Sequence, residues 1–294
     1  MISLVGRAGL VVAGVLVLGG CGADGKTPAA RPVSTAAERP SVARKKPHVT
    51  VPAGVRAGYV VYDRESGKVL LHEGARRTFR SASVVKILIA LDYLRGKTEV
   101  PAGDLAMLRP MLRSSDDGAA TRFWARGGKG AIIERSARVI GLRDTRPPPA
   151  DKPGFWGYTA LSAMDVARTY RFLLEKAPAA HRELIMGELR KATPCGLDKY
   201  DQYFGIPRAL PRPWAVKQGW SGFGDVPAVP CKAGLVRPAA APDLGLGRPV
   251  LHTTGVVGHR IVVVLTLHPA GSSFQVAAQR VTTLTKQVYR AADS

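Results

Sequence analysis

The sequence predicts an α+β fold: one antiparallel sheet with a terminal helix packed on it, and an inserted all-helical lobe. Three observations predict it. Strand-like runs form a hairpin over 59–72 and another over 250–267, helical apolar spacing fills the chain between them, and an amphipathic helix closes the chain. Strands from both ends can share one sheet, so the helical block becomes an insertion. The boundary between the two lobes is then a cleft, a common place for a ligand.

The first hairpin pairs 59–63 with 68–72 across a turn in which Gly67 supplies the positive φ. A buried helix over 83–94 follows, because its residues are apolar on nearly every side. Ser83 stands in the first turn of this helix. Free backbone N–H groups and the helix dipole favour a developing negative charge at that position.

Helical apolar spacing predicts five further helices in the lobe. They span 104–113, 117–125, 131–140, 162–176 and roughly 181–190. Pro110 bends or ends the first of these helices, Gly141 stops the third, and Ser162 opens the fourth in a capping-box-like start. The proline-rich residues 143–158 form a loop between the third and the fourth.

Three more strands complete the predicted sheet. They span 214–217, 250–257 and 260–267. The last two form a hairpin through Gly258, and the apolar run in the final strand is typical of a central strand. Ser272 or Ser273 caps the terminal amphipathic helix, whose apolar side can cover one face of the sheet.

Residues 1–20 have the layout of a signal peptide. One positive charge precedes an apolar run that is too short to span a bilayer and is followed by no stop-transfer pattern. The run ends in Leu18-Gly-Gly-Cys21, which resembles the lipobox of bacterial lipoproteins, whose cysteine becomes the lipidated first residue. An ordinary signal peptide with an incidental cysteine is the alternative. We therefore expect an exported lipoprotein, anchored through Cys21 on the outer face of the bacterial cytoplasmic membrane.

Residues 21–52 are rich in Ala, Pro, Lys and Arg and lack a hydrophobic period, which predicts a disordered basic tether. The folded domain then spans 53–294, with the inserted helical lobe at about 83–210. Hydrophobic residues make up 46% of the chain, enough for a sizeable core in this domain. We expect the domain to be a monomer.

The chain is strongly basic. It has 43 Lys and Arg against 22 Asp and Glu, which gives a formal net charge of +21. The basic residues are spread along the whole chain without interleaved aromatics, and no nucleic-acid motif is present, so nucleic acid is not an expected partner. Attraction to an anionic envelope surface fits the same charge.

Cys195 and Cys231 remain after the lipobox cysteine. An even number of cysteines in an exported protein predicts a disulfide. In the chain-entropy model such a bridge stabilises the fold by roughly 3–4 kcal/mol. Two buried free thiols are the alternative.

Ser83 and Lys86 form the only Ser-x-x-Lys of the chain. At i and i+3 of a helix the two side chains share a face and can touch. A half-buried lysine near other cations could take the proton of the serine. The alternative is a serine that caps the helix beside a solvated lysine. Only partners elsewhere in the chain can decide between these two interpretations.

Two such partners are present. Ser115-Asp-Asp117 enters a helix of the lobe, and Lys217-Gln-Gly219 lies on the predicted strand opposite. With the Ser-x-x-Lys they resemble the three motifs of penicillin-recognising serine enzymes, Ser-x-x-Lys, Ser-Asp-Asn and Lys-Thr-Gly. The likeness is to class A β-lactamases and extends over about 57–292 through the order of the elements.

The resemblance implies a role for each position. Ser83 would be the acylated nucleophile and Lys86 its base or proton relay. Ser115 would pass a proton toward the leaving nitrogen, and Lys217 would hold the substrate carboxylate. The backbone N–H groups of Ser83 and Trp220 would form the oxyanion hole.

Asp117, Gln218 and Gly219 would line the substrate, and two of them depart from the family pattern. Asp117 stands where the family has Asn, and a carboxylate cannot donate to a substrate carbonyl. Gln218 stands where a hydroxyl residue is usual; it still donates but is bulkier. Ser83 and Ser115 are also closer in sequence than is usual in class A enzymes, so one wall of the cleft is reduced.

The deacylating base is missing from the pattern. Class A enzymes use a loop glutamate to activate water, yet residues 135–174 contain no Glu. Asp144 and Asp151 are the only loop carboxylates, and each has an ordinary interpretation as a solvated loop residue.

These motifs predict a β-lactamase-like serine hydrolase of the cell envelope. It would form an acyl-enzyme at Ser83 with β-lactams or D-Ala-D-Ala-like peptidoglycan ends and would deacylate slowly. An inactive envelope-binding or scaffold protein that retains the fold is the alternative. No cofactor is expected, and the six histidines include no pair such as His-x-x-x-His, so no metal site is expected. An α/β-hydrolase is disfavoured because Phe223 ends the near match Gly219-Trp-Ser-Gly222 to the nucleophile elbow.

Overall fold

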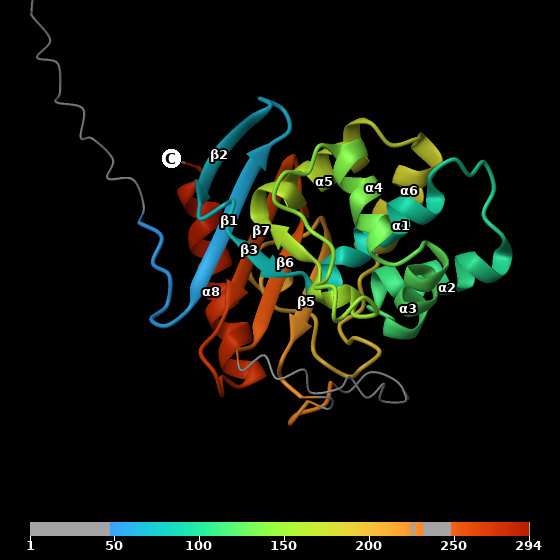
Figure 1. Cartoon of the computed structure of the whole chain (residues 1–294). Helices are drawn as coiled ribbons and strands as arrows, with labels where there is room; N and C mark the ends of the chain where they lie inside the picture. Colours follow the sequence, from blue (N-terminus) through green and yellow to red (C-terminus); the bar gives the residue numbers. More distant parts are fainter. Residues whose placement is uncertain (1–47, 225–226, 232–247, 294) are drawn as a thin grey trace, which may run out of the picture. The chain divides into compact units, whose positions relative to one another are not determined.

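Five antiparallel strands form the central sheet, in the order β2-β1-β7-β6-β5 (Figure 1). The computed structural model describes residues 48–224, 227–231 and 248–293, all within one unit that runs from Arg44 to Ser294. The strands are β1 (Arg56–Asp63), β2 (Lys68–Glu73), β5 (Trp214–Ser221), β6 (Val250–Val257) and β7 (Arg260–Leu267). The two predicted hairpins are therefore confirmed, and Gly67 has the expected positive φ of 69°.

The two faces of the sheet pack against different helices, because side chains alternate along a strand. Val60 of β1 and Val263 of β7 pack with the helical lobe, whereas Val61 and Val264 pack on the other face under α8 (Phe274–Ala291). Ser273 caps α8, as its side chain accepts a hydrogen bond from the backbone of Val276. The predicted terminal helix is thus present and covers the sheet.

The inserted lobe is helical, and it lies on the side of the sheet opposite α8 (Figure 1). Its longer helices are α1 (Lys86–Leu94), α2 (Ala102–Arg113), α3 (Asp117–Arg126), α4 (Gly130–Ile140), α5 (Ala163–Glu175) and α6 (Ala179–Arg190), followed by the short α7 (Ile206–Ala209). Gly141 ends α4 in the left-handed conformation, with φ of 77°, and Ser162 caps α5. Pro110 does not end α2, which continues to Arg113.

Three features of the lobe boundary differ from the sequence prediction. A two-stranded sheet, β3 (Thr78–Arg80) with β4 (Ala160–Ser162), joins the start of the lobe to α5. Ser83 lies in a 3-10 turn, η1 (Ala82–Val85), and not in the regular helix that follows. Strand β5 is eight residues long, twice the predicted length, because its pairing with β6 continues past Lys217 to Ser221.

The predicted bridge is present. Cys195 and Cys231 form a disulfide with their Cα atoms 5.7 Å apart, and it ties the loop after α6 to the loop after β5. The predicted signal peptide 1–20 and most of the predicted tether 21–52 fall outside the described residues. Within the described ranges, no helix is long and apolar enough to cross a membrane.

Candidate active site

Four of the predicted site residues meet in one buried hydrogen-bonded cluster. Lys86 Nζ donates to Ser83 Oγ at 2.8 Å and to Ser115 Oγ at 3.2 Å, and Lys217 Nζ donates to Ser115 Oγ at 2.9 Å. The cluster joins the start of α1, the loop before α3 and strand β5, which are far apart in sequence. All four residues are buried. Such a chain of contacts can pass a proton between Ser83 and Lys217.

Local backbone conformation orients the serines. Ala82, directly before Ser83, has a φ of 44°, and Ser115 has a φ of 60°, both in the left-handed region that non-glycine residues seldom adopt. At Ser115 this conformation turns both the carbonyl and the hydroxyl toward Lys86, which donates to the carbonyl at 2.7 Å. Left-handed residues of this kind often occur at functional sites, where the surrounding packing holds them.

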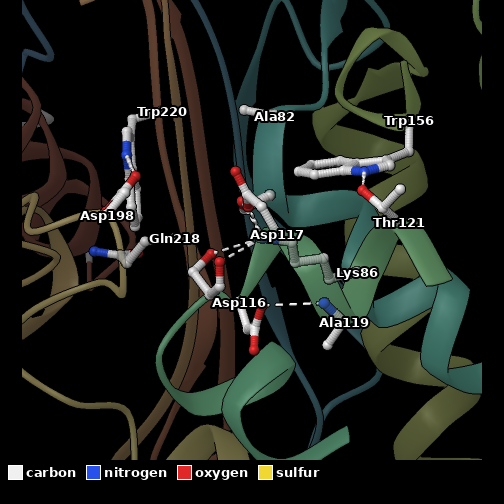
Figure 2. Close-up of polar contacts among 12 residues, drawn as sticks. Ala82, Lys86, Asp116, Asp117, Ala119, Thr121, Trp156, Asp198, Gln218 and Trp220 are labelled. Carbon is white, nitrogen blue, oxygen red and sulfur yellow. Dashed lines mark hydrogen bonds and ion pairs between the residues drawn. The ribbon is translucent and has the colours of Figure 1, made fainter. Parts of the chain in front are cut away.

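The two adjacent aspartates at the start of α3 have different roles. Asp116 is the helix cap, since its Oδ1 accepts from the backbone of Ala119 at 3.0 Å (Figure 2). Asp117 instead places Oδ1 2.5 Å from Lys86 Nζ. Lys86 is fully buried, whereas 40% of the Asp117 side chain is exposed. The carboxylate therefore balances the charge of a buried lysine, which is what a buried charge requires.

Lys217 has no such partner. Among the described residues no carboxylate lies within ion-pair distance of it, and its other contact is the carbonyl of Gln218 at 3.2 Å. Burial, and then the positive charge of Lys86, hold the pKa of Lys217 well below its ordinary value. The amine that touches Ser115 therefore loses its proton more easily than an exposed lysine does.

Gly219 brings strand β5 against the serine turn. A Cβ at this position would lie 3.0 Å from the carbonyl oxygen of Ser81 and 3.3 Å from the backbone nitrogen of Ser83. The segment that carries Trp220 therefore faces the backbone of Ser83, the arrangement that the predicted oxyanion hole needs. A hydrogen bond fixes the Trp220 indole, which donates to Asp198 Oδ2 at 2.7 Å.

The Gln218 side chain is not part of this cluster. It is 2% exposed, and its amide nitrogen donates to the carbonyls of Gln202 and Phe204 at 3.1 and 2.6 Å. Figure 2 shows this nitrogen turned away from Lys86. Successive side chains of a strand point to opposite faces, so Lys217 and Gln218 cannot both face the cleft.

Trp156 is a site residue that the sequence did not indicate. It belongs to a short turn, η2 (Trp156–Tyr158), and the Lys86 ammonium lies 4.6 Å from its ring centroid (Figure 2). Its indole nitrogen donates to Thr121 Oγ1 at 3.1 Å. Lys86 is thus covered by an aromatic face, a favourable position for a cation.

Neither loop aspartate reaches the cluster. Asp144 pairs with Arg76 and accepts from the Ser162 hydroxyl, which fixes it at the start of α5. Asp151 is 69% exposed and pairs with Lys152. In the part of the chain that the structure describes, Asp117 is the one carboxylate in direct contact with Lys86.

One group of side chains in the described ranges is spaced closely enough to share a metal ion. Asp63, Glu65 and His259 place ligand atoms within 4.8 Å of one another. They lie outside the cluster: Asp63 ends β1, and Glu65 and His259 lie on the turns after β1 and β6. The Asp63 carboxylate already accepts from the Glu65 backbone and the Ser66 hydroxyl. An aspartate that accepts hydrogen bonds from the next two or three residues is a common way to stabilise a turn, so these contacts do not by themselves indicate a metal site.

The fold is that of class A β-lactamases and penicillin-binding proteins. The class A β-lactamase from Mycobacterium abscessus superposes with a TM-score of 0.58 at 18% identity, over 82% of this chain and 95% of that one. PBP-A superposes equally well, at 15% identity over 83% of this chain and 92% of that one. A β-lactamase from Burkholderia vietnamiensis gives 0.57 at 19% identity, over 82% and 92%. No protein-family model matches the chain.

A curated relative is similar at the level of sequence. The chain is 39% identical over 203 residues to LppW of Mycobacterium tuberculosis, which is provisionally named a lipoprotein, and equally to LppW of Mycobacterium bovis. The match covers 66% of this chain and 63% of LppW, so it spans less than two thirds of the relative.

Proposed function

We propose that the chain is a serine hydrolase of the β-lactamase and penicillin-binding type, which forms an acyl-enzyme at Ser83. The substrates would be β-lactams or D-Ala-D-Ala-like peptidoglycan ends. The observation that carries the proposal is the buried contact of Ser83 Oγ with Lys86 Nζ, continued through Ser115 to Lys217. A nucleophile, a lysine at its hydroxyl and a second proton path are the parts that acyl transfer needs.

In the proposed reaction Ser83 Oγ attacks the acyl carbonyl while its proton passes to the Lys86–Ser115–Lys217 chain. The developing oxyanion is stabilised by the backbone N–H groups of Ser83 and Trp220. As the carbon–nitrogen bond breaks, Ser115 donates its proton to the leaving nitrogen and is reprotonated by a neighbouring lysine. Lys217 and the substrate carboxylate attract each other. The acyl group is left on Ser83 as an ester.

Deacylation would be slow. It needs a base on an attacking water. Among the described residues the one carboxylate in contact with the cluster, Asp117, is bound to Lys86, and Asp198 accepts from the Trp220 indole instead. Trp156 lies over Lys86, where its ring excludes water from that side. The lack of a positioned general base typically slows such a step by about 10²–10⁴-fold.

The anchoring of the protein is also a proposal. Cleavage before Cys21, lipidation of that cysteine and a tether over 21–52 would hold the domain 53–294 at the outer face of the membrane. The lipoprotein name of the relative LppW supports this. Replacing Cys21 by Ala should move the full-length protein from the detergent phase to the aqueous phase of a phase-separation experiment, and unchanged partitioning would reject the anchor.

Intact mass of the full chain after incubation with a fluorescent penicillin tests the enzyme. We expect one acyl group per chain, no adduct on Ser83→Ala, and slow loss of the adduct afterwards. Asp151→Asn, an exposed position away from the cluster, should change its release little. The solved acyl-enzyme complex of a PBP-A variant with penicillin G is the same kind of product in a protein of this fold.

A non-catalytic binding or scaffold protein is the second candidate. Asp117 favours it, because this residue binds Lys86 and, unlike the asparagine of the family pattern, cannot donate to a substrate carbonyl. A folded protein that forms no adduct at any penicillin concentration would select this candidate. An adduct on Ser83 excludes it.

A further inference from the structure

Asp117 is the most exposed charged side chain of the cluster. Its Oδ1 is bound to Lys86, yet 40% of the side chain is exposed, whereas Lys86 is fully buried. Within the described ranges Asp117 makes no other side-chain hydrogen bond. A carboxylate only accepts hydrogen bonds, so a ligand group that touches it must be a donor.

A second carboxylate, Asp198, lies near Asp117. It is half-buried behind Trp220, and its oxygens accept from the Trp220 indole at 2.7 Å and from the Tyr200 backbone at 3.2 Å. Burial raises the pKa of Asp198 above its ordinary value, the hydrogen bonds from the Tyr200 backbone and Trp220 oppose this, and the negative charge of Asp117 adds to the increase. Figure 2 shows Asp198 and Trp220 together on the left, and Trp156 above Lys86 on the right.

Aromatic surface adjoins these carboxylates. Trp156 is half-buried, and its ring already carries the Lys86 ammonium 4.6 Å from its centroid. Trp220, on the facing strand, is also half-buried. A carboxylate beside indole rings is a favourable environment for a cation, because ring faces and carboxylate oxygens are both negative. The same groups give no donor to a ligand carbonyl.

We propose that the cleft selects acyl donors that carry a primary ammonium group on the acyl side of the carbonyl attacked by Ser83, and that Asp117 is the residue that selects it. The inference rests on the proposed acyl-enzyme function. With the substrate carboxylate at Lys217 and the leaving nitrogen at Ser115, the acyl side chain is directed away from Lys217, toward Asp117 and Trp156. An ammonium there donates to the open carboxylate oxygen.

Three penicillins that differ at one group test the inference on the full chain. They are aminobenzylpenicillin, its N-acetyl derivative and benzylpenicillin, of which only the first carries an ammonium. Intact mass against time gives the acylation rate constant for each. The ammonium compound should react faster than the other two by about tenfold or more, the effect of one hydrogen bond to a charged group.

Asp117→Asn and Asp116→Asn form a matched pair of variants. Each removes one negative charge, but Asn still caps a helix at position 116. Asp117→Asn should bring the three rate constants to within about twofold of one another, less than the effect of a single hydrogen bond. Asp116→Asn should keep the wild-type preference. Equal rates for the three compounds on the wild-type protein would overturn the inference, and this comparison needs no variant to fold.

Failure of the proposed function gives a different result. If no penicillin acylates the wild-type protein, the enzyme proposal fails, and the preference is then measured as equilibrium binding of the same three compounds by titration calorimetry. Tighter binding of the ammonium compound, lost in Asp117→Asn and kept in Asp116→Asn, supports the inference. Equal binding, or no binding of any of the three, overturns it.

Discussion

The helical wall and the strand wall of the cluster bury a lysine in opposite ways. The helical wall (Ser83, Lys86, Asp117) supplies a carboxylate 2.5 Å from its lysine, so the pair carries no net charge. The strand wall (Lys217, Gly219, Trp220) gives its lysine only oxygen dipoles, and burial lowers the pKa of Lys217 instead.

The difference gives the two lysines separate uses. In the proposed reaction the ion-paired Lys86 would serve as a fixed donor and relay, whereas Lys217, whose pKa is lowered by burial, would accept a proton more easily. Ser115 contacts both lysines and connects the walls. One carboxylate would thus set two residues of the same type apart for the two proton-transfer tasks of the reaction.

Loss of the helical-wall lysine should have the largest effect. Lys86→Met removes the group that contacts the Ser83 hydroxyl, so acylation should slow by about 10²–10⁴-fold, the usual contribution of a positioned proton-transfer group. Lys217 contacts Ser115 and the Gln218 carbonyl but not Ser83, so Lys217→Met should slow acylation less. Stopped-flow fluorescence with a fluorescent penicillin measures both rates. A larger loss of acylation rate in Lys217→Met would mean that Lys217, on the strand wall, is the main base.

Reduction of the disulfide should have the second-largest effect, by loosening the strand wall. The bridge at Cys195 anchors the loop that carries Asp198, which in turn holds the Trp220 indole. Breaking it should lower the free energy of unfolding by roughly 3–4 kcal/mol in the chain-entropy model. Urea unfolding of the full chain with and without reductant measures this, with the Cys195→Ala/Cys231→Ala variant as the control that reductant should not affect. An unchanged wild-type midpoint would contradict the expectation.

Low pH should destabilise the pairing of the strand wall with its neighbouring strand β6. His252 of β6 lies opposite Gly219 and binds the carbonyl of Arg80 at 2.9 Å. Burial lowers the pKa of His252 to about 4, below its ordinary value of 6.5. The unfolded chain therefore binds this proton first, and stability falls as pH drops from 6.5 toward about 4.

The loss through His252 should amount to at most roughly 3 kcal/mol, from the size of the shift. Denaturant midpoints between neutral pH and pH 4 measure it, and His252→Gln should show a smaller pH dependence than the wild-type protein. The same dependence in both proteins would assign the acid sensitivity to another group.

Asp117→Asn should have the smallest effect on stability. Breaking a fully buried ion pair costs about 3–5 kcal/mol, but Asp117 is partly solvated, so a loss of about 1–2 kcal/mol is expected. Asp116→Asn is the control, because Asn also caps a helix and the cluster keeps its charges. Thermal unfolding of the two variants in parallel distinguishes them. Equal stability of both would mean that Lys86 needs no acid partner.

The sequence predicted the regular parts of the fold well. The hairpin β6–β7 has the predicted bounds, and the helix starts at Ser162 and Ser273 lie at predicted caps. Each of these depends on local chemistry, namely alternation along a strand or a side chain that caps the next turn. Such signals are complete within a few neighbouring residues.

The parts that were missed depend on distant contacts. Strands β3 and β4 have three residues each, too few to show a period, and their pairing spans the segment that contains α1 to α4. Trp156 lies in a proline-rich loop without a pattern, and only the folded chain places it over Lys86. The sequence places Asp117 in a family motif, but its ion pair with Lys86 forms only in the folded chain.

The disulfide between the loop after α6 and the loop after β5 has a practical consequence for preparing the protein. The thiol pool of a cytosol keeps cysteines reduced, so a preparation from that compartment would have Cys195 and Cys231 free. A preparation from an oxidising compartment would contain the bridge. Two laboratories could then hold samples of identical sequence that differ in the order of the Asp198 loop and in their measured affinity for a ligand. The oxidation state of this one pair should therefore be assayed before any such values are compared.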